Sequence, residues 1–140
     1  MAISAALCTS FRNEVLAMTP HVAGDAYLIA LYTNAATLSA ATTAYAATNE
    51  VASGAGYTTG GKALVGFTVT SDGVVAILDW TTDPAWTGAT FTARGALIYN
   101  STRSNKAVAV LDFGGDVTAT AGTFTVVLPS PAAATGLIRF

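Results

Sequence analysis

The chain has 140 residues, enough for one domain with its own hydrophobic core. Only 10% of them are Asp, Glu, Lys or Arg, against about 25% in an average soluble domain. The six basic residues are scattered and the formal net charge is −2, which excludes the basic face that nucleic-acid binding requires.

The shortage of charge has a second consequence. A free protein normally carries more charge to remain soluble, so we expect other subunits to cover part of this surface. The composition therefore predicts a homodimer or homotrimer, and a monomer that assembles only on its target is the alternative.

One helix is predicted, near the N-terminus. It comprises FRNEVLAM, residues 11–18, with Ser10 as its cap and Glu14 in its first turn, and Pro20 ends it. Cys8, just before it, is predicted to be a structural thiol that is at least partly buried.

The apolar face of this predicted helix also suggests that the N-terminal segment is an arm that contacts another chain. Phe11, Val15 and Met18 share one face, and a helix this short is marginal alone. We expect residues 1–22 to form an arm that contacts another subunit and residues 23–140 to form a single β-domain. In the alternative, the apolar face of the helix packs on its own sheet.

Alternating and apolar runs predict strands through the rest of the chain. Residues 35–61 are the least regular part, where 42–48 could form an edge strand. Ser71-Asp72-Gly73 predicts a tight hairpin, and 112–116 (DFGGD) a second turn. The predicted strands are AYLIALYT (26–33), KALVGFTVT (62–70), VVAILDW (74–80), ATFTARGALIYN (89–100), NKAVAVLDF (105–113), GTFTVVLP (122–129) and TGLIRF (135–140).

Seven or eight such strands with one short helix indicate an all-β fold, an antiparallel β-sandwich that is jelly-roll-like, with a closed barrel as the alternative. The predicted core residues are Phe91, Leu97, Val108, Val110, Phe124 and Val126.

Two runs of the sequence carry a resemblance. FTARGALIYNSTRSNKAVAVLDFGGD and IALYTNAATLSAATTAYAATNEVASGAGYTTGGKAL resemble a family of small virion proteins of tailed bacteriophages, and the likeness extends from MAISAALCTSF to GLIRF. The resemblance implies a structural part of the phage particle. It carries over no catalytic or binding motif.

No residue pattern predicts an enzyme, a metal or a cofactor. His21 is the only histidine, and its place beside Pro20 predicts an exposed or capping side chain. One Cys and one His cannot form a zinc site. The carboxylate pairs Asp79/Asp83 and Asp112/Asp116 lack the density of oxygen ligands of a calcium loop and are interpreted as turn residues.

The sequence also favours neither a membrane protein nor a secreted one. The uncharged run 26–49 is interrupted by Asn34 and many Thr and Ser residues, and the N-terminus lacks a basic leader. We expect the protein to be made in the host bacterial cytoplasm and to end on the outer capsid surface of the virion.

Several residues are candidates for contacts with partners. Trp86 lies on a polar connection where an aromatic has no local reason to be, and Arg94 is the one charge in the longest strand. The predicted interface residues are Phe11, Val15, Met18, Tyr57, Trp86 and Arg94.

The favoured function is a capsid decoration (cement) protein that binds the major capsid protein and copies of itself. A tail, fibre or adaptor component that binds other tail proteins is one alternative. Another is a carbohydrate-binding module for host recognition, whose stacking platform would be Tyr57, Trp80, Trp86 and Tyr99.

Overall fold

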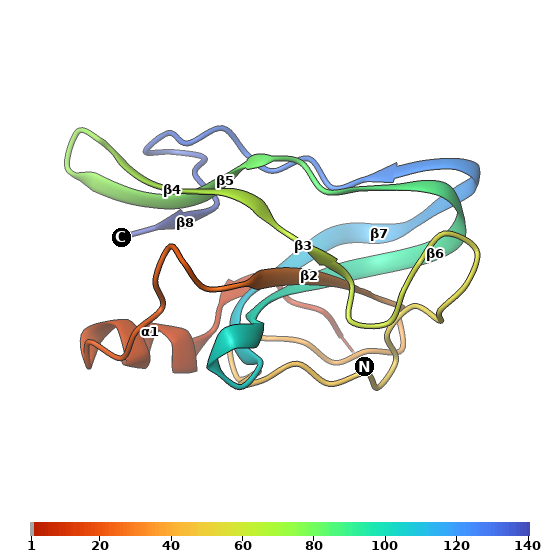
Figure 1. Ribbon diagram of the computed structural model, residues 1–140, viewed down its shortest axis with the longest axis horizontal. Helices are drawn as coiled ribbons and strands as arrows, with labels where there is room; N and C mark the ends of the chain where they lie inside the picture. Colours follow the sequence, from red (N-terminus) through yellow and green to blue (C-terminus); the bar gives the residue numbers. More distant parts are fainter. Residues whose placement is uncertain (1) are drawn as a thin grey trace.

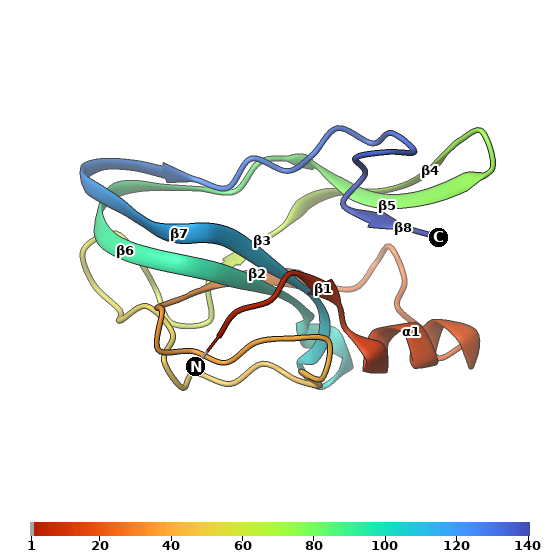
Figure 2. The ribbon, with the colours of Figure 1, turned by 180° about the vertical axis from the view of Figure 1, so that it is seen from behind.

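Two long strands organise the fold, which a computed structural model describes for residues 2–140 (Figures 1 and 2). Strand β6 (Ala85–Asn100) and strand β7 (Lys106–Thr125) are joined by the short 3₁₀ turn η1 (Ser101–Arg103) and pair antiparallel along their lengths. All other elements pack on or around this ribbon.

The strands form two antiparallel sheets, of five and three strands, and this confirms the predicted all-β sandwich. The larger sheet has the order β1-β7-β6-β2-β3 and the smaller one β4-β5-β8. The remaining elements are β1 (Ala6–Leu7), α1 (Thr9–Leu16), β2 (Tyr27–Tyr32), β3 (Lys62–Ala63), β4 (Val65–Asp72), β5 (Val75–Thr82) and β8 (Ile138–Arg139).

The β6–β7 ribbon contains a large bulge, where the sequence predicted a turn. Ala93 pairs with Val117 and Gly95 with Asp112, so four residues of β7, 113–116, lie opposite a single residue of β6. Gly114 supplies the positive φ that this conformation needs. The predicted turn at 112–116 is therefore wrong. The two strands expected on either side of it are one strand of 20 residues.

The second half of β6 is buried on both faces. Tyr99 stacks on Tyr45 of the irregular segment 35–61, at 4.5 Å between ring centroids, while Tyr27 on the opposite face of the sheet packs against Trp80 of β5. Every residue from Gly95 to Asn100 is buried as a result. The alternation of apolar and polar residues predicted only one buried face for this strand, whereas both faces are buried.

The segment 35–61 is fixed by one carboxylate. Glu50 accepts hydrogen bonds from the hydroxyl groups of Tyr45 and Tyr57, each at 2.6 Å, and from the backbone N–H of Gly60 at 2.7 Å. The edge strand predicted at 42–48 is reduced to a bridge between Ala44 and β7. These side-chain hydrogen bonds, together with scattered backbone bonds such as that from Val51 N–H to Leu31 O, replace a regular ladder in this layer.

Most of the predicted core is confirmed, and the predicted arm is partly integrated into that core. Phe91 is half-buried and packs against the core, whereas the other five predicted residues are buried. Strand β1 lies beside β7 and pairs with it (Figure 2). Ile3, Cys8 and Phe11 belong to the same core as the sheets. Burial raises the pKa of the Cys8 thiol to about 11, which fits the structural thiol expected there.

The start of the helix differs from the prediction. Helix α1 begins at Thr9, so Cys8 occupies the N-cap position and makes no side-chain capping bond. The Ser10 hydroxyl is buried without a hydrogen-bond partner among residues 2–140, and Glu14 lies beyond the first turn. Packing of Phe11 holds this helix in place of a cap.

Because the helix packs into the core, replacing Phe11 or Met18, which the sequence placed on one helix face, should have different effects on the free energy of unfolding. Phe11→Ala should lower the free energy of unfolding by about 3–5 kcal/mol, because it opens a cavity in the core. Met18→Ala, at a side chain that is 90% exposed, should change it by less than about 0.5 kcal/mol. Urea denaturation measures both, and equal effects would contradict the packing described here.

Candidate docking surface

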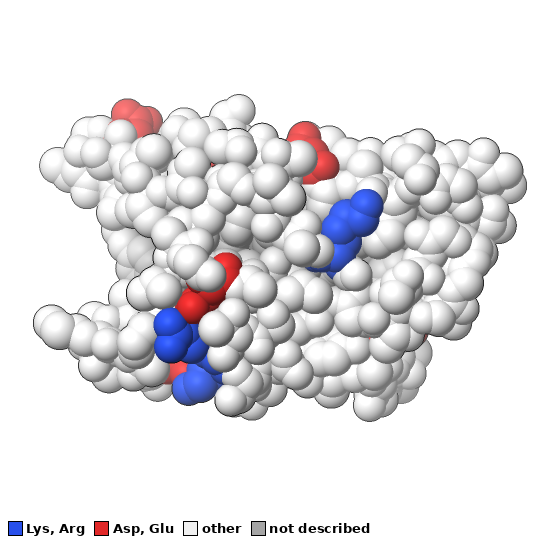
Figure 3. Space-filling view, viewed as in Figure 1, with Lys and Arg blue, Asp and Glu red and all other residues white. Residues whose placement is uncertain are grey.

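An apolar cleft opens at one end of the molecule, between α1 and the smaller sheet. Its volume is about 450 Å³. Figure 3 shows the corresponding hollow, with the β4–β5 hairpin above it and α1 below, and its rims carry few charged atoms. The cleft is lined by Phe11, Val15, His21, Val22, Ala23, Phe67, Val69, Ala76, Ile77, Leu78 and Phe140.

The rims of this cleft expose large apolar side chains. On the α1 side, Val15 and Val22 line the cleft and are 38% and 46% exposed. On the side of the smaller sheet, Val69 and Phe140 line it and are 65% and 54% exposed. Apolar side chains gathered around a hollow are typical of a surface that another chain covers.

Helix α1 brings two of the predicted interface residues to this cleft. Phe11 lies buried in its floor and Val15 forms part of its wall, whereas Met18 lies beyond the helix, 90% exposed, and is not among the lining residues. That these residues contact a partner stays a prediction. The sequence did not show that the smaller sheet would supply the wall opposite α1.

The other predicted interface residues lie elsewhere. The prediction that Trp86 lies on a polar connection is wrong. Trp86 lies within β6, where it is buried between Tyr57 and Phe124. Tyr57 is buried as well. Arg94 forms an ion pair with Asp112 across the β6–β7 ribbon.

The aromatic platform considered for sugar binding does not form. All four of its side chains, Tyr57, Trp80, Trp86 and Tyr99, are buried in this chain. A stacking platform needs exposed ring faces, so these residues do not provide one.

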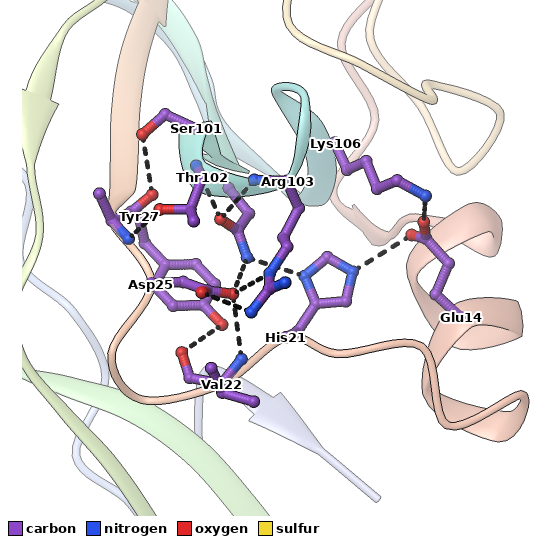
Figure 4. A network of polar contacts seen from close by, with 11 residues as sticks. Glu14, His21, Val22, Asp25, Tyr27, Ser101, Thr102, Arg103 and Lys106 are labelled. Atoms are coloured by element: carbon purple, nitrogen blue, oxygen red, sulfur yellow. Dashed lines mark hydrogen bonds and ion pairs between the residues drawn. The ribbon is translucent and has the colours of Figure 1, made fainter.

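A polar network fixes the lower side of the cleft (Figure 4). Glu14 of α1 pairs with Lys106 of β7 and lies 3.3 Å from His21 Nε2. Desolvation opposes the charge on Glu14, but hydrogen bonds from Lys106 and His21 prevail and hold its pKa below the usual value. The helix is thereby tied to the turn of the long ribbon.

Asn100 is the centre of this network and was not singled out in the sequence. It is completely buried, and its Oδ1 accepts hydrogen bonds from the backbone N–H groups of Thr102 and Arg103. That fixes the amide orientation, so Nδ2 donates to His21 Nδ1 at 3.1 Å and to Asp25 at 2.9 Å. The proton of the His21 ring then lies on Nε2, facing Glu14.

His21 is therefore buried, and the exposed position expected from its neighbour Pro20 is wrong. Its ring also packs edge-on against Phe11, with the centroids 5.0 Å apart. The sequence signal that could have indicated this is the capping pattern Asn100-Ser-Thr-Arg, which places an amide at the start of η1.

A second ion pair closes the network. Arg103 donates to both carboxylate oxygens of Asp25, at 2.8 and 2.9 Å, and Asp25 is almost completely buried. The paired guanidinium, together with Asn100 and the backbone N–H of Val22, holds the pKa of Asp25 well below its usual range. This pair anchors the loop that follows α1.

The upper side of the cleft is supported from outside. Residues 126–137 run over the outer face of the smaller sheet (Figure 2), where Ile77 and Asp79 are buried. Asp79 Oδ1 accepts the N–H of Trp80, and Oδ2 has no hydrogen-bond partner among residues 2–140. Desolvation raises the pKa of this carboxyl.

A second hollow, of about 350 Å³, lies between β7 and the C-terminal segment. Val117 and Val127 in its lining are 44% and 75% exposed, but the lining also includes the charged Asp112. Within residues 2–140, no Asp, Glu, Lys or Arg lines the cleft, so we place the candidate docking surface at the cleft.

Among residues 2–140, no three His, Cys, Asp or Glu side chains gather as potential metal ligands, and no helix is long and apolar enough to cross a membrane. No protein-family model, curated protein or solved structure matches this chain. The function is accordingly argued from the geometry of the chain itself.

The network predicts a large effect at Asn100. Asn100→Ala removes bonds to two buried backbone N–H groups, His21 and Asp25, and should lower the free energy of unfolding by about 2–4 kcal/mol. Thermal and urea denaturation measure the loss. Ser101→Ala, in the same turn, is the control and should cost less than about 1 kcal/mol, and similar losses would show that the network is dispensable.

The raised pKa of the buried Asp79 carboxyl should make the stability of the fold depend on pH. Because its pKa is higher in the folded than in the unfolded chain, the folded state binds more protons, and this group's contribution becomes less favourable as pH rises above about 4. Asp79→Asn should therefore gain stability relative to the unchanged protein as pH increases from 4 to 7. Parallel stability profiles would contradict the buried carboxyl.

Proposed function

We propose that the chain is a capsid decoration protein of a tailed bacteriophage, which binds the major capsid protein on the outer surface of the head. The observation that carries this proposal is the apolar cleft with its exposed rims. A surface of this kind becomes stable when another chain covers it.

The scarcity of charge supports the same function. Interface centres are depleted in charged residues, and no Asp, Glu, Lys or Arg in the described part of the chain lines the cleft. A head lattice offers many equivalent sites, so modest apolar contacts repeated over it give firm attachment through multivalency. The likeness of the sequence to small virion proteins points to the same class.

The buried network supports a rigid docking surface. Helix α1 is tied to η1 and β7 through Glu14 and His21, and the loop after it through Asp25. Such preorganisation lowers the entropy lost when a partner binds. The same features would serve a tail, fibre or adaptor component, which differs in the particle substructure that it binds.

The proposal predicts that rim charges abolish attachment. Val15→Glu combined with Val22→Glu should weaken binding to heads that lack this protein by at least about tenfold, because both side chains line the cleft and full burial of an aliphatic side chain contributes roughly 1.5–3 kcal/mol. Sedimentation of heads mixed with purified protein measures the bound fraction.

Val127→Glu is the matched control, since Val127 is 75% exposed and lies outside the cleft. It should bind as the unchanged protein does. Attachment of the unchanged protein to isolated tails and not to heads would replace the decoration function with the tail alternative. Equal binding by the rim variant would show that the cleft is not the attachment site.

A further inference from the structure

The smaller sheet ends in a bare edge strand. Strand β4 pairs with β5 in one continuous register, from Val65 opposite Thr82 to Asp72 opposite Val75. The sheet order places β4 at its outer side, and no strand among residues 2–140 pairs with its other edge. Its outward backbone N–H and C=O groups are therefore available to a further strand.

This edge also lacks the features that normally prevent pairing. Strand β4 contains no Lys, Arg or Pro and no register shift, and its one charge, Asp72, stands at its end. Its one residue at positive φ, Gly66, lies near the other end, outside the central residues 67–71. Val65 and Val69 are 58% and 65% exposed.

The other edges of the two sheets are short or interrupted. Strands β1, β3 and β8 have two residues each, and the outer part of β7 carries Asp112, Asp116 and the bulge. Strand β4 is thus the edge at which sheet extension meets the least resistance.

We propose that a second copy of this chain binds at this edge, with the two β4 strands antiparallel about a two-fold axis at Val69, so that the two small sheets become one of six strands. An antiparallel pair of identical strands is self-complementary, as a closed dimer requires. Because of the two-fold axis, the same strand supplies both sides of the contact.

The register follows from the side chains. Phe67 and Val69 face the cleft, and a pairing centred on Val69 keeps this face on the same side of the sheet in both copies. Thr68 of each copy then lies opposite Thr70 of the other, a cross-strand pair that favours sheets. The two Asp72 carboxylates are about 20 Å apart at 3.4 Å per residue, beyond the screening length of roughly 8 Å.

This dimer deepens the proposed function without depending on it. Because the cleft-facing sides coincide, both clefts open on the same face of the six-stranded sheet. A particle surface would then meet two docking sites at once, which increases the effective affinity. Self-association through β4 is measured in the absence of any particle.

A cysteine placed on the two-fold axis tests the geometry. Val69→Cys should form an intermolecular disulfide under mild oxidation, because directly opposite residues have Cβ atoms about 4.5–5.5 Å apart, close to the disulfide range. The native Cys8 is completely buried and contributes no background. The product is a dimer on a non-reducing gel.

Val74→Cys is the matched control on the same hairpin. This position is fully exposed, but its two copies would be about 34 Å apart across the axis. At equal protein concentration, Val69→Cys should cross-link at least tenfold faster than Val74→Cys. Equal rates, or faster cross-linking at position 74, would overturn the proposed register.

Sedimentation without cross-linking completes the test. The unchanged protein should sediment as a dimer at micromolar concentration, and Val69→Lys should sediment as a 14.1 kDa monomer, because it places two ammonium groups opposite each other. Val74→Lys should remain dimeric. A monomer or a trimer for the unchanged protein overturns the dimer and leaves the head-binding experiment unaffected.

Discussion

The burial of β6 on both faces is the constraint on which the rest of the structure depends. From Gly95 to Asn100 the strand has no exposed residue, so something must cover each side of the larger sheet. The smaller sheet covers one side through Trp80 and Phe67, which pack on Tyr27. The irregular segment 35–61, held by Glu50, covers the other. A strand that is buried twice forces a three-layer arrangement on a chain of ordinary length.

The same constraint explains the position of the polar network. Asn100 lies at the end of β6, where the buried strand turns into η1, and its amide must find partners there. It finds them in η1, in His21 and in Asp25. The residues after α1 are thereby fastened to the ribbon, and the helix stands away from the smaller sheet with an apolar cleft between them. A polar requirement of the core therefore determines the shape of the candidate docking surface.

Six of the fourteen Asp, Glu, Lys and Arg side chains pair with one another within the chain. Glu14, Asp25, Arg103 and Lys106 belong to the network, and Arg94 pairs with Asp112. Little charge remains for the cleft and the outer edge of β4. These are the surfaces that offer apolar side chains and unpaired backbone groups, which suits a protein that completes its surface by assembly.

The sequence by itself determined the fold class, the hairpin after Ser71 and most of the core, because period-two alternation depends only on local pleating. It also led to the prediction that Phe11, Val15 and Met18 contact a partner. It could not show that Trp86 is buried, that His21 bridges two carboxylate-bearing segments, or that 112–116 is a bulge. Those outcomes were decided by which distant segment packs on which strand face. Alternation predicts one buried face, whereas only the tertiary structure revealed that β6 has two, and with them the cleft and the free edge.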